Sequence, residues 1–196
     1  MDCPFSIWTT LQNTAEGDLP QELNLPAVGQ KWTLVYVPDH RPQALTQRQP
    51  SMRFDESDGE SRIRIFHRPD APPTLAQVSA LLEEYLRERA RYHFHGLVRE
   101  VADSTGLPLP DKIRIGMQRS RWGSLSTRRV LSLSARLLFL PTGLVRHIVI
   151  HELCHFEQMN HKPAFHRCVA RYDPAAEANR AALRNAVKML PDWCRM

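Results

Sequence analysis

The alternation of apolar and polar residues predicts short strands in the first third of the chain. Residues 32–37 are rich in β-branched and aromatic side chains, and residues 61–66 alternate between polar and apolar ones. The acidic, glycine-containing stretch 55–60 between them is typical of a turn. Residues 1–30 carry no periodicity that predicts an element. We therefore expect an N-terminal arm over residues 1–30, which need not be ordered, and a single domain over residues 31–196.

Apolar side chains at three- and four-residue spacing predict helices in most of the remaining chain. A long helix is expected from Thr74, a residue type that suits a helix N-terminus, to about Val101. A second, mostly buried helix is expected over residues 144–156, after a Pro-Thr-Gly break. Residues 163–171 and 174–190 are expected to be helical as well.

Two further strands are expected between these helices, over residues 112–117 and 130–134. A turn over residues 121–129 would make them an antiparallel pair that leads into the second helix. This order of elements predicts an α+β fold, with a small, mostly antiparallel sheet and helices packed on it. Strand 130–134 is a candidate edge to which an extended peptide could add, although a plain core hairpin explains the same pattern equally well.

The sequence His151-Glu152-Leu153-Cys154-His155 lies within the predicted buried helix. Residues four apart lie about one helical turn apart, so both imidazoles can face one Zn²⁺ ion with the glutamate beside it. Zinc lowers the pKa of a bound water, and a neighbouring carboxylate can accept that water's proton. The pattern favours a metal-dependent hydrolase with Glu152 as general base. The alternative is a helix of hydrogen-bonded core histidines.

A catalytic zinc usually has three protein ligands, and His161 is the favoured third candidate. A continuous helix would rotate His161 about 80° away from the metal-binding face, so the helix must end first. Asn160 can adopt the left-handed conformation that closes a helix, and Pro163 suits the first turn of a new one. His166 and Glu177 are the two rival ligands.

The other histidines and the cysteine within the motif fit structural roles. His147, one turn before the first motif histidine, is more typical of a residue that supports ligands than of a ligand. His93 and His95 are two apart on a predicted helix and therefore face different sides. Cys154 points away from the ligand face, which favours packing.

The composition excludes several classes of protein. No uninterrupted apolar stretch of about 18 residues is present, which argues against a membrane span. The N-terminus lacks the basic and apolar segments of a secretory signal, so we expect a cytoplasmic protein. The four cysteines form no Cys-x-x-Cys pair, which argues against a disulfide framework or a thiolate zinc site.

Charge is divided unevenly along the chain. Residues 1–111 contain 11 Lys and Arg against 16 Asp and Glu, whereas residues 112–196 contain 15 against 5. The half that contains the histidine motif is thus strongly basic and could attract acidic peptides or nucleic acid. A solvated basic surface is the favoured interpretation, because no nucleic-acid-binding motif is present.

Several short motifs between residues 112 and 172 occur together in this order: Arg121-Trp122-Gly123-Ser124, Val130-Leu131-Ser132-Leu133-Ser134, Leu137-Leu138, Pro141, the histidine motif, Asn160-His161 and Phe165. This combination resembles the YgjP-like metallopeptidases, small bacterial proteins similar to the SprT-like zinc peptidases. The resemblance implies a zincin-like core with the motif on a helix, zinc ligands at His151, His155 and His161, and Glu152 as general base. Leu125 and His166 depart from the family pattern, which commonly has cysteine and often tryptophan there.

We therefore expect a zinc-dependent peptidase that holds one Zn²⁺ per chain and acts on a peptide or protein. Arg121, His166 and Tyr172 are all chemically able to stabilise the negative charge that develops on the carbonyl oxygen. The main alternative is a zinc-stabilised DNA- or protein-binding module with weak or lost peptidase activity, although an intact Glu152 argues against loss. A third interpretation is hydrolysis of a phosphodiester or a small amide.

Overall fold

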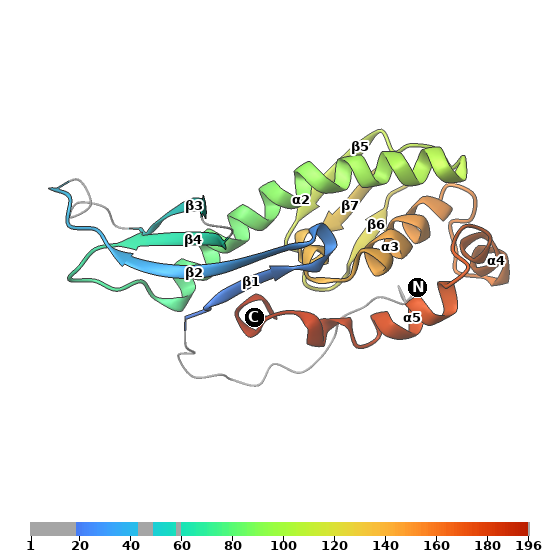
Figure 1. The fold of residues 1–196 in the computed structure, drawn as a ribbon. Helices are drawn as coiled ribbons and strands as arrows, with labels where there is room; N and C mark the ends of the chain where they lie inside the picture. The colour runs from blue at the N-terminus through green and yellow to red at the C-terminus, as the bar shows by residue number, and fades with distance from the viewer. Residues whose placement is uncertain (1–18, 43–48, 58–59, 196) are drawn as a thin grey trace.

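Two small sheets and one long helix organise the chain (Figure 1). The computed structural model describes residues 19–42, 49–57 and 60–195. The first sheet consists of β1 (Glu22–Leu25), β2 (Gln30–Pro38), β3 (Ser51–Ser57) and β4 (Glu60–His67). The second consists of β5 (Lys112–Gly116), β6 (Gly123–Leu125) and β7 (Val130–Ser134). The predicted α+β class is confirmed, with two sheets in place of the one expected.

The four-stranded sheet has the strand order β1-β2-β4-β3. β2 and β4 are parallel, whereas the two outer pairings are antiparallel. The strands predicted at 32–37 and 61–66 correspond to β2 and β4. Alternate side chains of these strands are buried, as the period-two pattern requires; they are Trp32, Leu34, Ile63 and Ile65.

The turn predicted over residues 55–60 is shorter than expected, because the antiparallel strands β3 and β4 pair as far as Ser57 and Glu60. Residues 58–59 lie outside the described residues. Asp55 and Glu56 belong to β3, and β4 begins at Glu60. Asp55 forms an ion pair of 2.5 Å with Arg64 on the neighbouring strand. Opposite charges on adjacent strands stabilise strand pairing, so an acidic run does not by itself mark a turn.

The expected N-terminal arm over residues 1–30 does not extend as far as residue 30. Residues 1–18 lie outside the described part of the chain. β1 pairs with β2, and Leu23 and Leu25 are buried in the core. A short 3₁₀ helix, Pro26–Val28, joins the two strands. Residues 22–30 are therefore part of the sheet and its connection, because two leucines at alternate positions are enough to anchor an edge strand.

Helix α2 (Leu75–Thr105) begins where the sequence predicts and runs along both sheets (Figure 1). Thr74 and Gln77 form a reciprocal capping box, in which each side chain binds the other residue's backbone N–H. Gly106 ends the helix in the left-handed conformation, with φ of 72°. The buried stripe of α2 continues to Ala102, so one helix supports both sheets.

The three-stranded sheet differs from the predicted hairpin. Its strand order is β5-β7-β6, and β5 and β7 are parallel rather than antiparallel. β6 lies within the predicted turn 121–129 and forms the antiparallel pair with β7. Val130–Ser134 is consequently the central strand, and the prediction that it is an edge is wrong. Leu131 and Leu133 are fully buried there, whereas the edge positions belong to β5 and β6.

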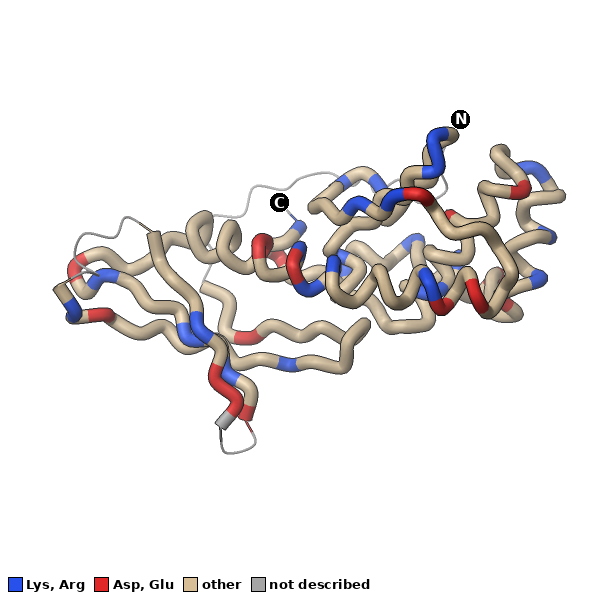
Figure 2. The backbone as a smooth tube through the Cα atoms, turned by 90° about the horizontal axis from the view of Figure 1, so that it is seen from above, with Lys and Arg blue, Asp and Glu red and all other residues tan. Residues whose placement is uncertain are grey.

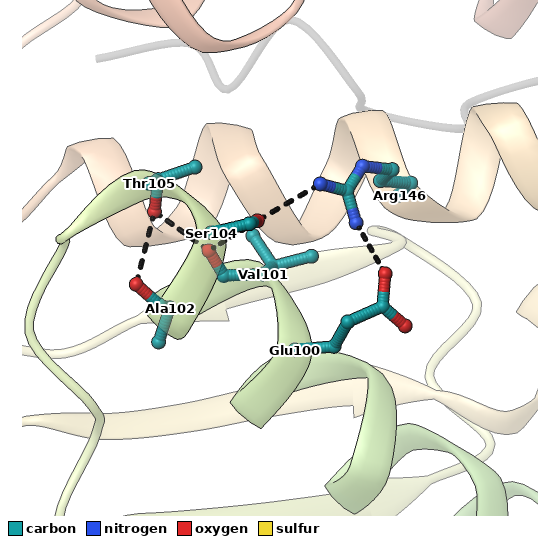
Figure 3. A network of polar contacts seen from close by, with 6 residues as sticks. All are labelled: Glu100, Val101, Ala102, Ser104, Thr105 and Arg146. Atoms are coloured by element: carbon teal, nitrogen blue, oxygen red, sulfur yellow. Dashed lines mark hydrogen bonds and ion pairs between the residues drawn. The ribbon is translucent and has the colours of Figure 1, made fainter.

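Helix α3 (Thr142–Cys154) packs against the C-terminal end of α2 through apolar and polar contacts. Arg146 donates to Glu100 (2.9 Å) and to the Ser104 hydroxyl (3.0 Å), so its guanidinium joins α3 to the last two turns of α2 (Figure 3). These groups are exposed and stabilise the fold only slightly.

The C-terminal quarter of the chain is helical, largely as predicted. It consists of α4 (Pro163–Tyr172), α5 (Ala176–Leu183), the 3₁₀ helix η3 (Ala186–Met189) and α6 (Asp192–Arg195). In the described part of the chain, every helix is too short or too polar to cross a membrane. A location in the cytoplasm stays a prediction.

Candidate metal centre

Helix α3 carries the first two motif histidines into the protein interior. His151 and Glu152 lie in its last turn and are 3% and 2% exposed. His155 is the C-cap, and its N–H donates to the carbonyl groups of Glu152 and Leu153. The motif therefore straddles the end of the helix, which leaves the next residues free to turn back toward it.

The segment after α3 places the ring of His161 next to the rings of His151 and His155. One ring nitrogen from each of His151, His155 and His161 lies within 4.8 Å of the others. The Nε2 atoms of His151 and His161 are 3.2 Å apart. Two nitrogens at 2.0–2.1 Å from a tetrahedral zinc would lie about 3.3 Å apart, so this pair has the spacing that such an ion requires. The ring nitrogen of His155 lies within 4.8 Å of both.

The helix closes differently from the prediction made for Asn160. Among the residues that the structure describes, Arg129 is the one non-glycine residue with a positive φ, so Asn160 is not left-handed. The chain turns instead over residues 155–157, where successive backbone N–H groups bond to carbonyl groups three residues back. Pro163 then occupies the first turn of α4, as predicted.

The hydrogen bond of His155 sets which of its nitrogens faces the cluster. Nδ1 of His155 lies 3.1 Å from the Gln158 carbonyl oxygen, which can only accept. Nδ1 therefore carries the proton, and Nε2 keeps its lone pair. A carbonyl partner of this kind is the usual support for a metal-binding histidine.

Burial keeps the three imidazoles neutral. It lowers the pKa of His151 to about 2, with the neighbouring histidines adding to the effect. Burial is also the main cause of the lowered pKa of His155 and of His161. Only a neutral imidazole has a lone pair to give, so the cluster suits a cation.

Phe165 on α4 forms one wall of the histidine cluster. Its ring stacks on His155, with centroids 4.6 Å apart, and meets His151 and His161 edge-on at 4.7 Å. The sequence analysis gave Phe165 no role in the site. Its position could have indicated this role. Phe165 lies in the first turn of α4, which begins two residues after the third ligand, and a residue so close in the chain is expected near that ligand.

The carboxylate of Glu152 is enclosed between α3 and β6. Burial raises the pKa of Glu152 to about 8, while a hydrogen bond from the Leu125 backbone and the positive charge of Arg121 oppose that rise. Its Oε1 atom is buried and accepts no hydrogen bond from any residue that the structure describes. A buried carboxylate oxygen without a donor, on the residue that follows His151, is suited to a water or a cation.

Gly123 leaves the space that this carboxylate occupies. A Cβ atom at Gly123 would lie 3.0 Å from both Cγ and Oε1 of Glu152. Gly123 belongs to the Arg-Trp-Gly-Ser motif, so β6 and the glutamate are packed directly together. The sequence analysis missed this contact, because the two residues are far apart in the chain.

His147 lies outside the group of converging histidines and has a structural role, as its position predicted. Its Nδ1 lies 2.5 Å from Asp173, and Asn179 donates to the same carboxylate oxygen at 3.0 Å. Asp173 is the C-cap of α4, and Asn179 lies on α5. This buried network ties α4 and α5 to the helix that carries His151.

The two rival ligands lie outside the cluster. Glu177 is exposed and forms an ion pair with Arg180. His166 is exposed on α4, although its ring lies close enough for its charge to lower the pKa of His161 after the larger effect of burial. Neither belongs to the group of three side chains that converge.

Comparison with known proteins identifies the family. A family model described as the YgjP-like metallopeptidase domain matches residues 9–186. No curated protein and no solved structure matches the chain. The matched region covers most of the chain and includes the whole histidine cluster. The chain therefore belongs to the YgjP-like metallopeptidase family.

Proposed function

We propose that this chain is a zinc-dependent peptidase with one Zn²⁺ held by His151, His155 and His161. The observation that carries the proposal is the convergence of three imidazoles at the end of the helix that also holds the buried Glu152. A bound zinc ion would polarise the substrate carbonyl and activate a water at neutral pH. Proton transfer, substrate binding and stabilisation of the oxyanion are assigned to side chains and backbone groups of the protein.

Glu152 is proposed to carry the proton. Its free Oε1 accepts a proton from the attacking water and returns it to the leaving amine. The pKa of about 8 that burial produces is too high for an efficient base at neutral pH. The charge of a nearby cation would lower that pKa, which fits a carboxylate that becomes ionised when the metal binds.

We propose β6, rather than β7, as the strand to which an extended peptide adds. The carbonyl of Trp122 accepts from Ser134, and the N–H of Ser126 donates to Val130, so these residues face β7. In an antiparallel pair the intervening Gly123 presents its backbone groups outward. A peptide bound there would lie beside Glu152, which packs on the same glycine.

Arg121 and His166 are the proposed donors to the developing oxyanion. The charge of Arg121 acts on Glu152, and that of His166 acts on His151 and His161. The hydroxyl of Tyr172, the third candidate, instead donates to Glu157 at 3.4 Å. Arg121 lies two residues before β6, and His166 lies on α4.

The proposal is tested by metal content and cleavage together. We expect about one zinc per chain by elemental analysis of untagged protein, and cleavage of a mixed peptide library detected by mass spectrometry. Removing zinc with a chelator should abolish cleavage, and adding zinc back should restore it. Protein that takes up no zinc at neutral pH would contradict the proposal, and zinc-loaded protein that cleaves no peptide would favour the binding-module alternative.

The variant Gly123→Ala should displace the Glu152 carboxylate from its position in the site. The added Cβ would lie 3.0 Å from Glu152, so the side chain must shift. We expect peptidase activity to fall at least about tenfold and the free energy of unfolding to fall by about 1–3 kcal/mol, with zinc content unchanged. Gly143→Ala on α3 is the matched control, because a Cβ there meets nothing within 4 Å. Equal activity in the two variants would show that the contact has no functional role.

A further inference from the structure

The second sheet and its flanking segments form a part of the chain with no negative charge. Residues 112–151 contain eight Lys and Arg and no Asp or Glu. Two of the eight, Lys112 and Arg114, lie on β5, and four more lie in the connections on either side of β6. By contrast, basic and acidic positions lie side by side on the β3–β4 hairpin of the four-stranded sheet (Figure 2). The asymmetry seen along the sequence is thus concentrated on one structural unit.

Some of these cations are compensated and others are not. Arg129 pairs with Asp111 and Arg146 with Glu100, while Arg136 is buried. The remaining five are exposed, and no ion pair joins any of them to a described residue; they are Lys112, Arg114, Arg119, Arg121 and Arg128. By contrast, the arginines of β4 pair with Glu60 and Asp55. Charge left uncompensated on one unit is available to an external partner of opposite charge.

The strand register places two of these cations on one flat face with hydroxyl groups. Arg114, Ser132 and Ser124 are opposite one another across β5, β7 and β6. Lys112 lies two residues before Arg114 and hence on the same face, about 6.6 Å away. The opposite face carries Leu131 and Leu133 and is buried. We call Lys112, Arg114, Ser124 and Ser132 the basic sheet face.

We propose that the basic sheet face binds the phosphate backbone of double-stranded nucleic acid without regard to base sequence. Arginine, lysine and serine side chains are common donors to phosphate oxygens, and such contacts carry no sequence information. Arg128 lies in the turn that connects β6 to β7 and adds charge at the end of this face. The proposal does not depend on the peptidase activity.

The chemistry of the face favours a duplex over single strands or an acidic polypeptide. Single-strand binders stack bases on aromatic side chains, and the four residues of the face include none. Trp122, at the end of β6, is 1% exposed and cannot stack. Cations at a fixed spacing along a strand suit the regular charges of a duplex, whereas an acidic peptide must lose chain entropy to match them.

Fluorescence anisotropy with a labelled 20-base-pair DNA of arbitrary sequence tests the proposal. We expect binding by the full-length protein that weakens with salt, with a slope of log K against log salt of about −3 for three to four phosphate contacts. The double variant Lys112→Glu/Arg114→Glu should weaken binding at least about tenfold and reduce the slope by about 2. The control Arg99→Glu/Lys188→Glu makes the same charge change at exposed positions on α2 and η3 and should bind like the unmodified protein.

Several outcomes would overturn the proposal. They are no duplex binding at 50 mM salt, equal weakening by the two double variants, or tighter binding of poly-glutamate or single-stranded DNA than of duplex. Circular dichroism and thermal unfolding establish that each variant is folded. If charge reversal prevents folding, Lys112→Gln/Arg114→Gln is measured in its place, and an unchanged affinity in that variant contradicts the assignment.

Discussion

Glu152→Gln should lower kcat for peptide hydrolysis by about 10²–10⁴-fold while zinc content and KM stay close to those of the unmodified enzyme. The glutamine amide has nearly the shape of the carboxylate but cannot accept a proton. Glu152 is 2% exposed, so no bulk water can take over its role. The variant should fold at least as stably, because the buried site no longer has to hold an ionisable group. Steady-state kinetics on a cleaved library peptide and elemental analysis provide the two readouts.

Glu157→Gln is the matched control for this prediction. Glu157 follows five residues later, and its carboxylate contacts Tyr172 and Cys168 rather than the histidine cluster. The same loss of charge there should leave kcat within about twofold of the original, because only a group at the reacting atoms contributes to proton transfer. Full activity in Glu152→Gln would exclude the general-base role. Equal losses in both variants would show that the effect is one of local charge.

His161→Ala should lower zinc affinity by at least about 100-fold. Loss of a residue that only hydrogen-bonds to a ligand lowers metal affinity by about 10–100-fold, and loss of a ligand itself should cost more. His161 supplies the ring nitrogen that lies 3.2 Å from Nε2 of His151, so its removal leaves two ligands where three converge. The residue is half-buried in the connection before α4. The metal-free variant should therefore unfold at the same temperature as the metal-free original. Competition with a chromogenic chelator measures the affinity.

His166→Ala and Glu177→Ala complete this comparison. Both side chains are exposed, and Glu177 is engaged with Arg180. Neither change should alter zinc affinity by more than about twofold, because neither side chain lies among the converging atoms. Zinc retained by His161→Ala but lost by either of the other variants would assign the third ligand elsewhere.

The ends of helices could be predicted from sequence, because they depend on residues that are close together in the chain. The start of α2 at Thr74 follows from a capping box that spans four residues. The end of α3 before His161 follows from the rotation of a helix and from the proline that begins α4. These are short-range constraints, and they were enough to predict that three histidines converge at the end of α3.

The pairing of strands could not be predicted in the same way. Residues 112–117 and 130–134 form strands as expected, yet β6 inserts between them in sequence and makes their pairing parallel. A three-residue strand of Gly, Ser and Leu has no recognisable period. Which strand is central depends on which side chains the helices cover, and that involves α2 and α3 together.

The sequence by itself determined the chemistry available to this protein, because residues spaced like His151 and His155 share a face on any helix, with Glu152 as the neighbour of the first. The uncompensated positive charge of residues 112–151 was equally visible in the chain. Only the tertiary structure decided what surrounds those groups. The contact of Gly123 with Glu152, the wall formed by Phe165 and the row of Arg114 with two serines all join segments that are distant in sequence. Such contacts arise from packing the whole core, for which no local pattern carries the information.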